Sequence, residues 1–333
     1  MSAIPRVGFA SLGGTITMAP QSSDGTIVPT LTAEDLVASV PGLGELATLD
    51  VHTLSRSPGA SLTPRDVIDA VAWARDQVDR GCDGVVIAQG TDTLEETAFL
   101  AELLWDREQP LVFTGAMRGP AKSSADGVAN LLAATRAAVS AGLRGTGVSV
   151  VIDDTIHLAS RVRKNHSYAL WAFESPNGGP IGTVVEDQVR LGAIPPRREP
   201  IRLAETIDEV VVVPLLETFL GDDGSLLDSA IERGARGVVI AAFGAGHLPL
   251  ATAEVVSRVS ADVPIVVATR TGRGGTLSST YGFPGSETDL LRRGAILSGM
   301  LDERKARMLL WLLVASGASK KAIAAEVLAR GSR

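Results

Sequence analysis

Two short threonine-containing loops and one lysine are the residues in this sequence best suited to covalent chemistry. The first loop, Gly13-Gly14-Thr15, follows a strand-like run, and its glycines let the backbone turn tightly below a small hydroxyl group. A threonine hydroxyl is a poor nucleophile at its ordinary pKa, so it needs a neighbouring base or cation to take its proton. Taken alone, Gly-Gly-Thr is more typical of a structural turn than of a nucleophile.

The second loop, Gly90 to Thr93, also follows a strand-like run and precedes a helical one. Helix capping accounts for Thr93 and Glu96, because a hydroxyl group and an early carboxylate satisfy the free amides and the dipole of a helix start. Capping does not require Thr91 and Asp92 as well. Hydroxyl, carboxylate and hydroxyl groups in a row after a glycine favour a site for a polar ligand that carries an amine.

Lys164 is one of five lysines in a chain with 26 arginines. Lysine can be desolvated until its amine accepts a proton near neutral pH, whereas arginine stays protonated. Lys164 is therefore a candidate for handling protons at such a site. By itself, a lysine in a loop is more often a solvated charge.

Alternating strands and helices are expected to position these groups. Residues 7–11, 85–88, 111–114 and 148–152 are strand-like, and residues 64–80, 94–105 and 125–141 repeat apolar side chains at helical spacing. This alternation predicts a parallel sheet covered on both faces, with ligands bound beyond the carboxyl ends of the strands. We expect four loops to meet there, at residues 12–16, 89–93, 115–118 and 153–155.

The chain is long enough for two α/β domains. A connector rich in Pro and Arg, residues 191–200, lacks periodicity, so we predict a first domain at 1–190, a linker at 191–208 and a second domain at 209–333. Strand-like runs in the second domain occupy residues 209–213, 238–242 and 264–268, and helical patterns fill the C-terminus from Asp302 onward.

The composition argues against several classes of protein. A net charge of -7 without an extended basic cluster indicates neither a nucleic-acid partner nor a membrane partner, so we expect a small-molecule ligand. Cys82 is the only cysteine and no signal-peptide pattern is present, which favours a reducing cytoplasm. The four histidines lack metal-site spacing and no dinucleotide fingerprint follows a strand, so we expect neither a metal nor a cofactor.

Together these motifs resemble the bacterial L-asparaginase and glutaminase-asparaginase family. Its two signatures read here as Gly13-Gly-Thr-Ile16 and Gly90-Thr-Asp-Thr-Leu-Glu-Glu-Thr97, and the second is long and specific. The likeness extends over essentially the whole chain through further matches at residues 115–118, 124–127, 130–131, 154–155 with Lys164, and 304–307.

The resemblance implies a flavodoxin-like N-terminal domain, a smaller C-terminal α/β domain, and a homodimer or homotetramer with shared active sites. It implies amide hydrolysis through an acyl-enzyme, with Thr15 as the nucleophile. Thr91, Asp92 and Lys164 would handle protons, and Asp92 would also hold the amino group of the substrate. The backbone amides near Thr91 and Ala116 would stabilise the oxyanion.

The remaining candidate substrate contacts include departures from the family pattern. Gly59 stands where the family has a serine that binds the α-carboxylate, and Ser57 or Ser61 is a candidate replacement. The tyrosine usual in the loop after the nucleophile is missing, with Thr26 at about its place; Tyr281, with Glu287, is a candidate to complete the site across a dimer. The other expected contacts are Gln89, which replaces a histidine, Gly90 and His247.

Three functions remain open on these residues. The leading one is hydrolysis of L-asparagine to L-aspartate and ammonia. The second is hydrolysis of a related amide, such as glutamine or a modified asparagine, because the contacts to the α-carboxylate and the loop tyrosine differ from the family pattern. The third is a protein that binds its ligand at the sheet edge without turning it over.

Overall fold

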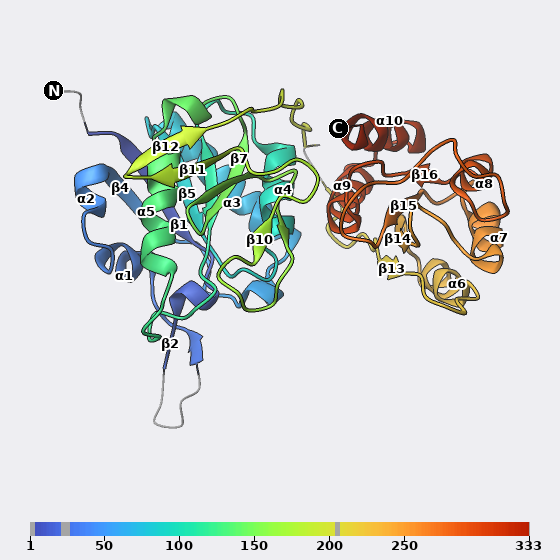
Figure 1. Cartoon of the computed structure of the whole chain (residues 1–333), viewed down its shortest axis with the longest axis horizontal. Helices are drawn as coiled ribbons and strands as arrows, with labels where there is room; N and C mark the ends of the chain where they lie inside the picture. The colour runs from blue at the N-terminus through green and yellow to red at the C-terminus, as the bar shows by residue number, and fades with distance from the viewer. Residues whose placement is uncertain (1–3, 21–26, 204–206, 333) are drawn as a thin grey trace. The chain divides into compact units, whose positions relative to one another are not determined.

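The computed structural model describes residues 4–20, 27–203 and 207–332. It divides into two compact units, Met1–Ile201 and Arg202–Arg333 (Figure 1). The division falls inside the predicted linker. The first part of that connector packs on the first unit, because Arg197 Nε donates to Glu102 Oε1 at 3.0 Å and Ile201 N donates to Leu103 O at 2.6 Å.

The first unit is built on an eight-stranded sheet with a parallel core. In spatial order the parallel strands are β4 (Thr48–Thr53), β1 (Arg6–Ser11), β5 (Gly84–Ala88), β6 (Leu111–Thr114) and β7 (Val148–Ile152). This is the flavodoxin-like order, in which the chain reverses direction across the sheet beside β1. The predicted fold class is confirmed, and the switch point lies between β1 and β5.

Three antiparallel strands that were not predicted extend this sheet beyond β7. They are β8 (Thr155–Leu158), β11 (Gly182–Val185) and β12 (Gln188–Leu191). A two-residue turn joins β7 to β8, with Asp153 and Asp154 at φ 51° and 53°. Two successive residues at positive φ are typical of the tight hairpin turn that matches strand twist, and aspartate tolerates this conformation better than most residues.

Helices cover both faces of the sheet (Figure 1). On one face lie α1 (Ala33–Ala38), α2 (Leu43–Leu46) and α5 (Gly127–Ala138), and on the other lie α3 (Pro64–Asp79) and α4 (Leu94–Leu104). All residues of β5 are buried, as expected for a strand covered on both sides. Helix α3 begins at a capping box between Thr63 and Asp66, and Gly81, just after it, adopts φ 94° before the chain enters β5.

Several short elements connect this framework. They are η1 (Thr15–Thr17), β2 (Met18–Pro20), β3 (Ile27–Pro29), η2 (Gly59–Ser61), η3 (Ala141–Leu143), β9 (Arg163–Lys164) and β10 (Phe173–Glu174). β2 pairs with β3, and β9 pairs with β10, both antiparallel. Thr26 lies outside the described residues.

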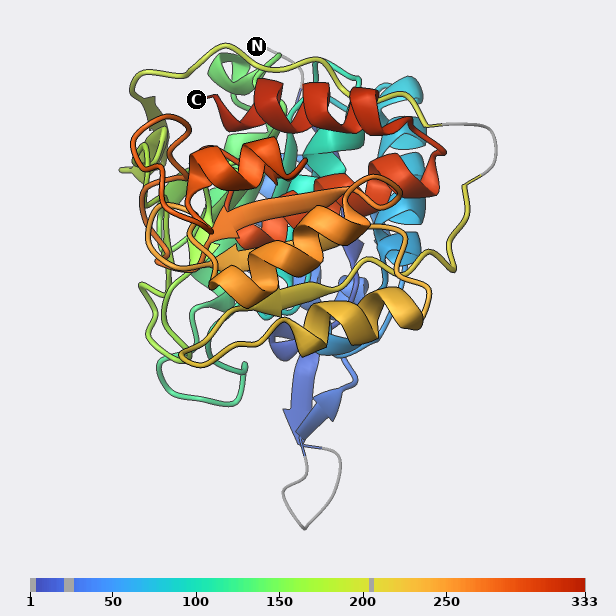
Figure 2. The same ribbon diagram turned by 90° about the vertical axis from the view of Figure 1, so that its right-hand side faces the viewer.

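The second unit contains a smaller parallel sheet between two helical layers. The strands, in order, are β13 (Leu215–Glu217), β14 (Val238–Ala242), β15 (Ile265–Thr269) and β16 (Ile296–Leu297). One layer holds α6 (Ser225–Glu232), α7 (Leu250–Val259) and α8 (Glu287–Arg292), and the other holds α9 (Glu303–Ala315) and α10 (Lys320–Gly331). Figure 2 views this unit from the side of α6 and α7.

The strand predicted at residues 209–213 is wrong. Asp208 and Val211 form a turn, and regular pairing with β14 begins only after Pro214, at Leu215. Val211 and Val213 are buried while Val210 and Val212 are exposed, so the segment alternates as a strand does. Its backbone bond from Arg236 N to Val212 O does not extend into a regular ladder. Within the described ranges, no helix has both the length and the apolar character needed to cross a membrane.

Candidate active site

Three glycines bring the loops after β1, β4 and β5 into direct backbone contact. A Cβ atom on Gly14, which has φ 87°, would lie 2.1 Å from Gly90 Cα, and one on Gly59 would lie 3.2 Å from the same atom. At Gly14 only a residue without a side chain permits this approach, and at Gly59 a Cβ would make a tight contact that Gly90 must yield to. Thr15 and Thr91 each directly follow one of the two touching glycines, Gly14 and Gly90.

Lys164 lies on β9 and binds the second threonine loop. Its Nζ donates to Thr91 Oγ1 at 2.9 Å and to Asp92 Oδ1 at 2.8 Å. The side chains of Lys164 and Asp92 are 14% and 67% exposed, so the amine is largely enclosed while the carboxylate faces solvent. The structure thus brings together Thr91, Asp92 and Lys164, residues separated by more than 70 positions in the chain.

Thr15 is half-buried at the start of η1. The turn is fixed by Thr17, whose amide and hydroxyl group both donate to Gly14 O, at 2.9 and 2.8 Å. Within the described part of the chain, no hydrogen bond engages the Thr15 hydroxyl group.

The loop after β6 packs against the Thr91 loop. A Cβ on Gly115 would lie 2.6 Å from Gln89 O. Asn130 ties this loop to the loop after β7, because its Nδ2 donates to Gly115 O and its Oδ1 accepts from Asp153 N, both at 3.0 Å. The four loops predicted to carry function thus meet at one edge of the sheet.

Two backbone amides at this edge belong to the buried residues Thr91 and Ala116. Among the described residues, no acceptor takes the backbone N–H of Thr91 or Ala116. Asp126 holds the next two amides, accepting from Met117 N and Arg118 N at 2.9 Å each. The loop is thereby fixed while the Ala116 amide is left available, an arrangement that suits an oxyanion donor.

The other predicted contacts of the first unit differ in accessibility. Gln89 is fully buried and its Nε2 donates to Gly90 O and to Thr97 Oγ1, so its side chain supports the loop from beneath. Gly59 is also buried, and its carbonyl accepts from Thr93 Oγ1 at 2.9 Å. Ser61 is exposed, whereas Ser57 is half-buried against Gly13.

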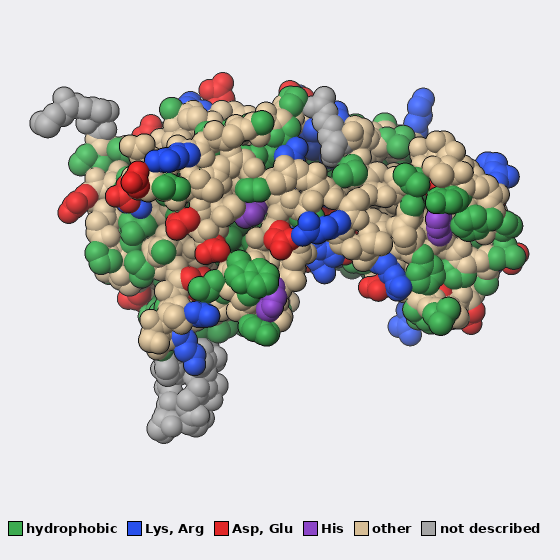
Figure 3. All heavy atoms as spheres, viewed as in Figure 1, with side chains coloured by type: hydrophobic (Ala, Val, Ile, Leu, Met, Phe, Trp, Pro, Cys, Tyr) green, Lys and Arg blue, Asp and Glu red, His purple; other side chains and the backbone are tan. Residues whose placement is uncertain are grey.

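His247 and Tyr281 lie in the second unit, in an aromatic cluster of their own with Phe283. The His247 ring meets each of the other two edge-on at 5.1 Å. Figure 3 shows hydrophobic side chains gathered on this face of the second unit. Tyr281 is 44% exposed, so its ring is accessible from solvent in the chain.

The carboxylate of Glu287 contacts both the backbone and the histidine of this cluster. Its fully buried side chain accepts from Thr280 N at 2.7 Å and Tyr281 N at 2.6 Å, and it lies 3.2 Å from His247 Nε2. Burial acts to raise the pKa of Glu287, but these hydrogen bonds hold that pKa below its ordinary value. Glu287 is therefore a buried carboxylate that orients His247 and the backbone of Tyr281.

His157 and Glu95 are two buried residues that sequence reasoning did not single out. His157, on β8, is 3% exposed, and its Nδ1 lies 2.9 Å from Ser175 Oγ, just after β10. Burial lowers the pKa of His157 to about 4, against a weaker opposing effect of Glu174. Glu95 is 3% exposed, and its Oε2 accepts from Lys164 N at 3.0 Å. Glu95 lies within the Gly90–Thr97 signature, but the motif does not distinguish it from Glu96, and no spacing pattern marks His157.

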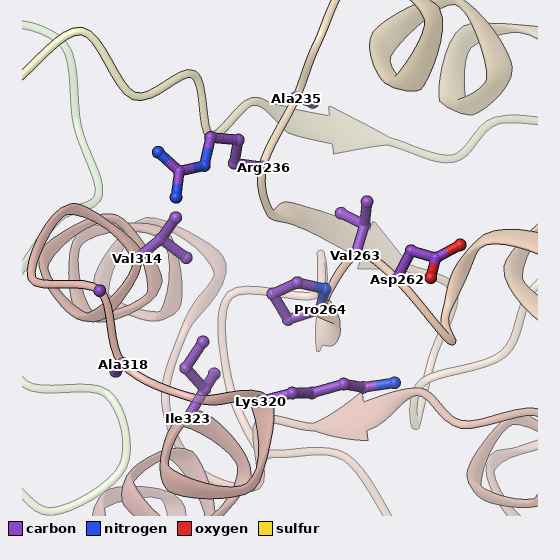
Figure 4. A pocket seen from close by; sticks show the side chains of 10 residues that line it. Ala235, Arg236, Asp262, Val263, Pro264, Val314, Ala318, Lys320 and Ile323 are labelled. Atoms are coloured by element: carbon purple, nitrogen blue, oxygen red, sulfur yellow. The ribbon is translucent and has the colours of Figure 1, made fainter. Parts of the chain in front are cut away.

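A cavity of about 270 Å³ lies elsewhere, at the amino ends of the strands in the second unit (Figure 4). Its two basic side chains already have partners: Arg236 binds Asp208 at 2.8 Å, and Lys320 donates to Ser260 O. Ligands of parallel sheets bind at the opposite, carboxyl edge. We therefore assign this cavity no ligand. In the described part of the chain, no three His, Cys, Asp or Glu side chains are grouped as for a metal ion.

Comparison with known proteins gives the same domain pair. Residues 6–197 match the family described as "Asparaginase, N-terminal", and residues 212–326 match the "Glutaminase/Asparaginase C-terminal domain". The chain belongs to the asparaginase family. The predicted family is confirmed, and with it the class of enzyme, an amidohydrolase.

Individual relatives resemble this asparaginase-family chain over nearly its full length. A "Probable L-asparaginase" of Deinococcus radiodurans is 36% identical over 330 residues, covering 97% of each chain. An "L-asparaginase" of Bacillus licheniformis is 30% identical, covering 93% of this chain and 96% of the relative. The crystal structure of a "Probable Cytoplasmic L-asparaginase" from Campylobacter jejuni superposes with a TM-score of 0.83 at 27% identity, covering 97% of this chain and 99% of that one.

Proposed function

We propose that this protein is an L-asparaginase that hydrolyses L-asparagine to L-aspartate and ammonia through an ester on Thr15. The observation that carries the proposal is the Lys164 amine, which donates at once to Thr91 Oγ1 and Asp92 Oδ1 beside the Gly14–Gly90 contact. A cation that donates to a hydroxyl oxygen makes the proton on that oxygen easier to remove. Relatives with the printed name L-asparaginase support this substrate.

In the proposed first step, Thr15 Oγ1 attacks the side-chain amide carbon of asparagine. The proton of the Thr15 hydroxyl group passes by way of Thr91 to the amide nitrogen, and the C–N bond breaks to release ammonia. The negative charge on the carbonyl oxygen is held by the amides of Thr91 and Ala116, and one such donor is worth roughly 3 to 4 kcal/mol of barrier. Water then hydrolyses the ester, which releases aspartate and restores Thr15.

The exposed carboxylate of Asp92 is proposed to bind the amino group of the substrate as well as Lys164. Ser57 is the better candidate for the α-carboxylate, since Gly59 and Gln89 are buried and Ser61 lies on the exposed side of η2. A hydrogen bond to a charged group contributes about 1.5 to 3 kcal/mol, so this contact affects which amide is preferred. An amide with an altered α-carboxylate is accordingly the alternative substrate.

We further propose a homodimer or homotetramer in the cytoplasm, in which Tyr281 of one subunit completes the site of another. The support is the exposure of the Tyr281 ring above a backbone fixed by Glu287, together with the absence of a tyrosine from the loop after Thr15. An exposed aromatic residue on a rigid backbone is a typical interface anchor. The cytoplasmic location is supported by the printed name of the Campylobacter jejuni relative.

Ammonia release by the wild type and by Thr15→Ala, with Thr15→Ser as the matched variant that keeps a hydroxyl group, tests the function. We expect turnover of L-asparagine by the wild type, partial turnover by Thr15→Ser and loss in Thr15→Ala. Activity that survives in Thr15→Ala rules out the nucleophile. Turnover of glutamine or a modified asparagine alone identifies the alternative hydrolase, and calorimetric binding of aspartate without any turnover identifies a binding protein.

A further inference from the structure

Lys164 lies on a two-residue strand whose position depends on its surroundings. Among the described strands, β9 pairs only with β10, also of two residues, at Lys164↔Phe173 and Arg163↔Glu174. So short a ladder is not stable in water by itself. Contacts with the rest of the first unit must therefore hold the backbone of Lys164 in register with Thr91.

Glu95 makes such a contact with the main chain of the lysine. It lies in the first turn of α4, and its Oε2 accepts the backbone N–H of Lys164 at 3.0 Å. Its side chain is buried, and burying a carboxylate is costly unless hydrogen bonds compensate. A carboxylate can favour the helix dipole from the surface, so the dipole alone does not require Glu95 to be buried.

A single short segment, residues 91–95, therefore binds both the side-chain amine and the backbone amide of Lys164. Thr91 and Asp92 bind its side-chain Nζ, and Glu95, one helical turn further along the chain, binds its backbone N. On the far side of the hairpin, the His157–Ser175 hydrogen bond ties the end of β10 to β8 of the main sheet. Displacing the Lys164 amide would move Nζ relative to Thr91 Oγ1.

We propose that Glu95 is a positioning residue for catalysis, which sets the register of β9 through the Lys164 amide and so delivers Nζ to Thr91. The proposal rests on the proposed role of Lys164 in amide hydrolysis. In this role Glu95 is a hydrogen-bond acceptor. The position of the Lys164 amide then depends on the length of the Glu95 side chain and on its acceptor oxygen more than on its charge. Misplacing a catalytic group by about 1 Å can cost about a hundredfold in rate.

Three substitutions at Glu95 separate reach, acceptor and charge. Glu95→Gln keeps an oxygen at the same reach, Glu95→Asp keeps the charge but is one methylene shorter, and Glu95→Ala removes both. With L-asparagine as the probe, we expect kcat to fall by at least about tenfold in the Asp and Ala variants at little-changed KM, and to be largely retained in the Gln variant. Glu96→Ala, which removes a carboxylate from the same helical turn, is the matched control and should keep kcat.

Thermal unfolding of each variant identifies those that fail to fold, and the comparison then rests on the folded ones. The proposal is overturned if folded Glu95→Asp or Glu95→Ala keeps wild-type kcat, if Glu95→Gln falls as far as Glu95→Ala, or if KM alone changes. Lys164→Met in the same assay separates failure of the proposed hydrolysis chemistry from failure of the proposed role of Glu95. An active Lys164→Met enzyme refutes the proposed chemistry, whereas an inactive one beside an active Glu95→Ala enzyme refutes only the role of Glu95.

Discussion

His157 should make the first unit sensitive to mild acid. The imidazole is buried in the folded chain, where its pKa is about 4, and it returns to about 6.5 on unfolding. Between these two pKa values the unfolded chain binds a proton at His157 and the folded chain does not. The free energy of unfolding therefore falls as the pH falls through this range, and the contribution of His157 is fully present above about pH 6.5. Replacing His157 with Asn removes the titration while leaving a polar atom near the position of Nδ1 for Ser175.

The size of the effect follows from the two pKa values. The full difference corresponds to about 3 kcal/mol, of which about 2 kcal/mol is lost between pH 7 and pH 5. This is a large part of the stability of an ordinary domain. His157 is also joined through Ser175 to the hairpin that carries Lys164, so the acid-sensitive region includes the proposed site.

Urea unfolding of the wild type and of His157→Asn at pH 7 and pH 5 gives the free energy of unfolding of each protein at each pH. The loss between the two pH values in the wild type, minus the loss in the variant, measures the contribution of His157. The wild type should lose about 2 kcal/mol more than the variant between the two pH values. An NMR titration of the His157 ring supplies the pKa directly. An equal loss in the two proteins, or a folded-state imidazole that titrates near 6.5, would refute the reasoning.

Three further perturbations test the geometry of the proposed site. Gly14→Ala should lower the free energy of unfolding of the first unit, measured in urea, by roughly 1 to 3 kcal/mol or more and abolish turnover, because the added Cβ meets Gly90 Cα at 2.1 Å. Gly44→Ala, at a position with open space around it, should leave stability and turnover unchanged. Ser57→Ala should raise KM for asparagine about tenfold or more and Ser61→Ala should not; the reverse order would assign the carboxylate contact to Ser61. Tyr281→Phe should cut kcat at least about tenfold without changing the sedimentation coefficient, which reports the oligomeric state. Unchanged turnover would remove Tyr281 from the site.

Local sequence patterns were sufficient for much of the parallel framework. The strands near residues 7–11, 85–88, 111–114 and 148–152 are buried β-branched runs, and the parallel connection of such strands forces their carboxyl ends to one edge. The meeting of the Thr15 and Thr91 loops follows from that rule. The hairpin extension after β7 was missed: a loop was expected at residues 153–155, and two aspartates at positive φ there turn the chain back into an antiparallel strand.

The sequence by itself determined the family, the two α/β domains and the threonine loops, because these depend on spacing along the chain. Only the tertiary structure decided what holds Lys164: Glu95 is 69 residues away from it, and His157 acts through Ser175 across a hairpin. It also decided that Gln89 and Gly59 face inward, since burial depends on how three loops pack around their glycines. Contacts between distant segments have no periodicity in the sequence, and they exist only once the backbone has brought the segments together.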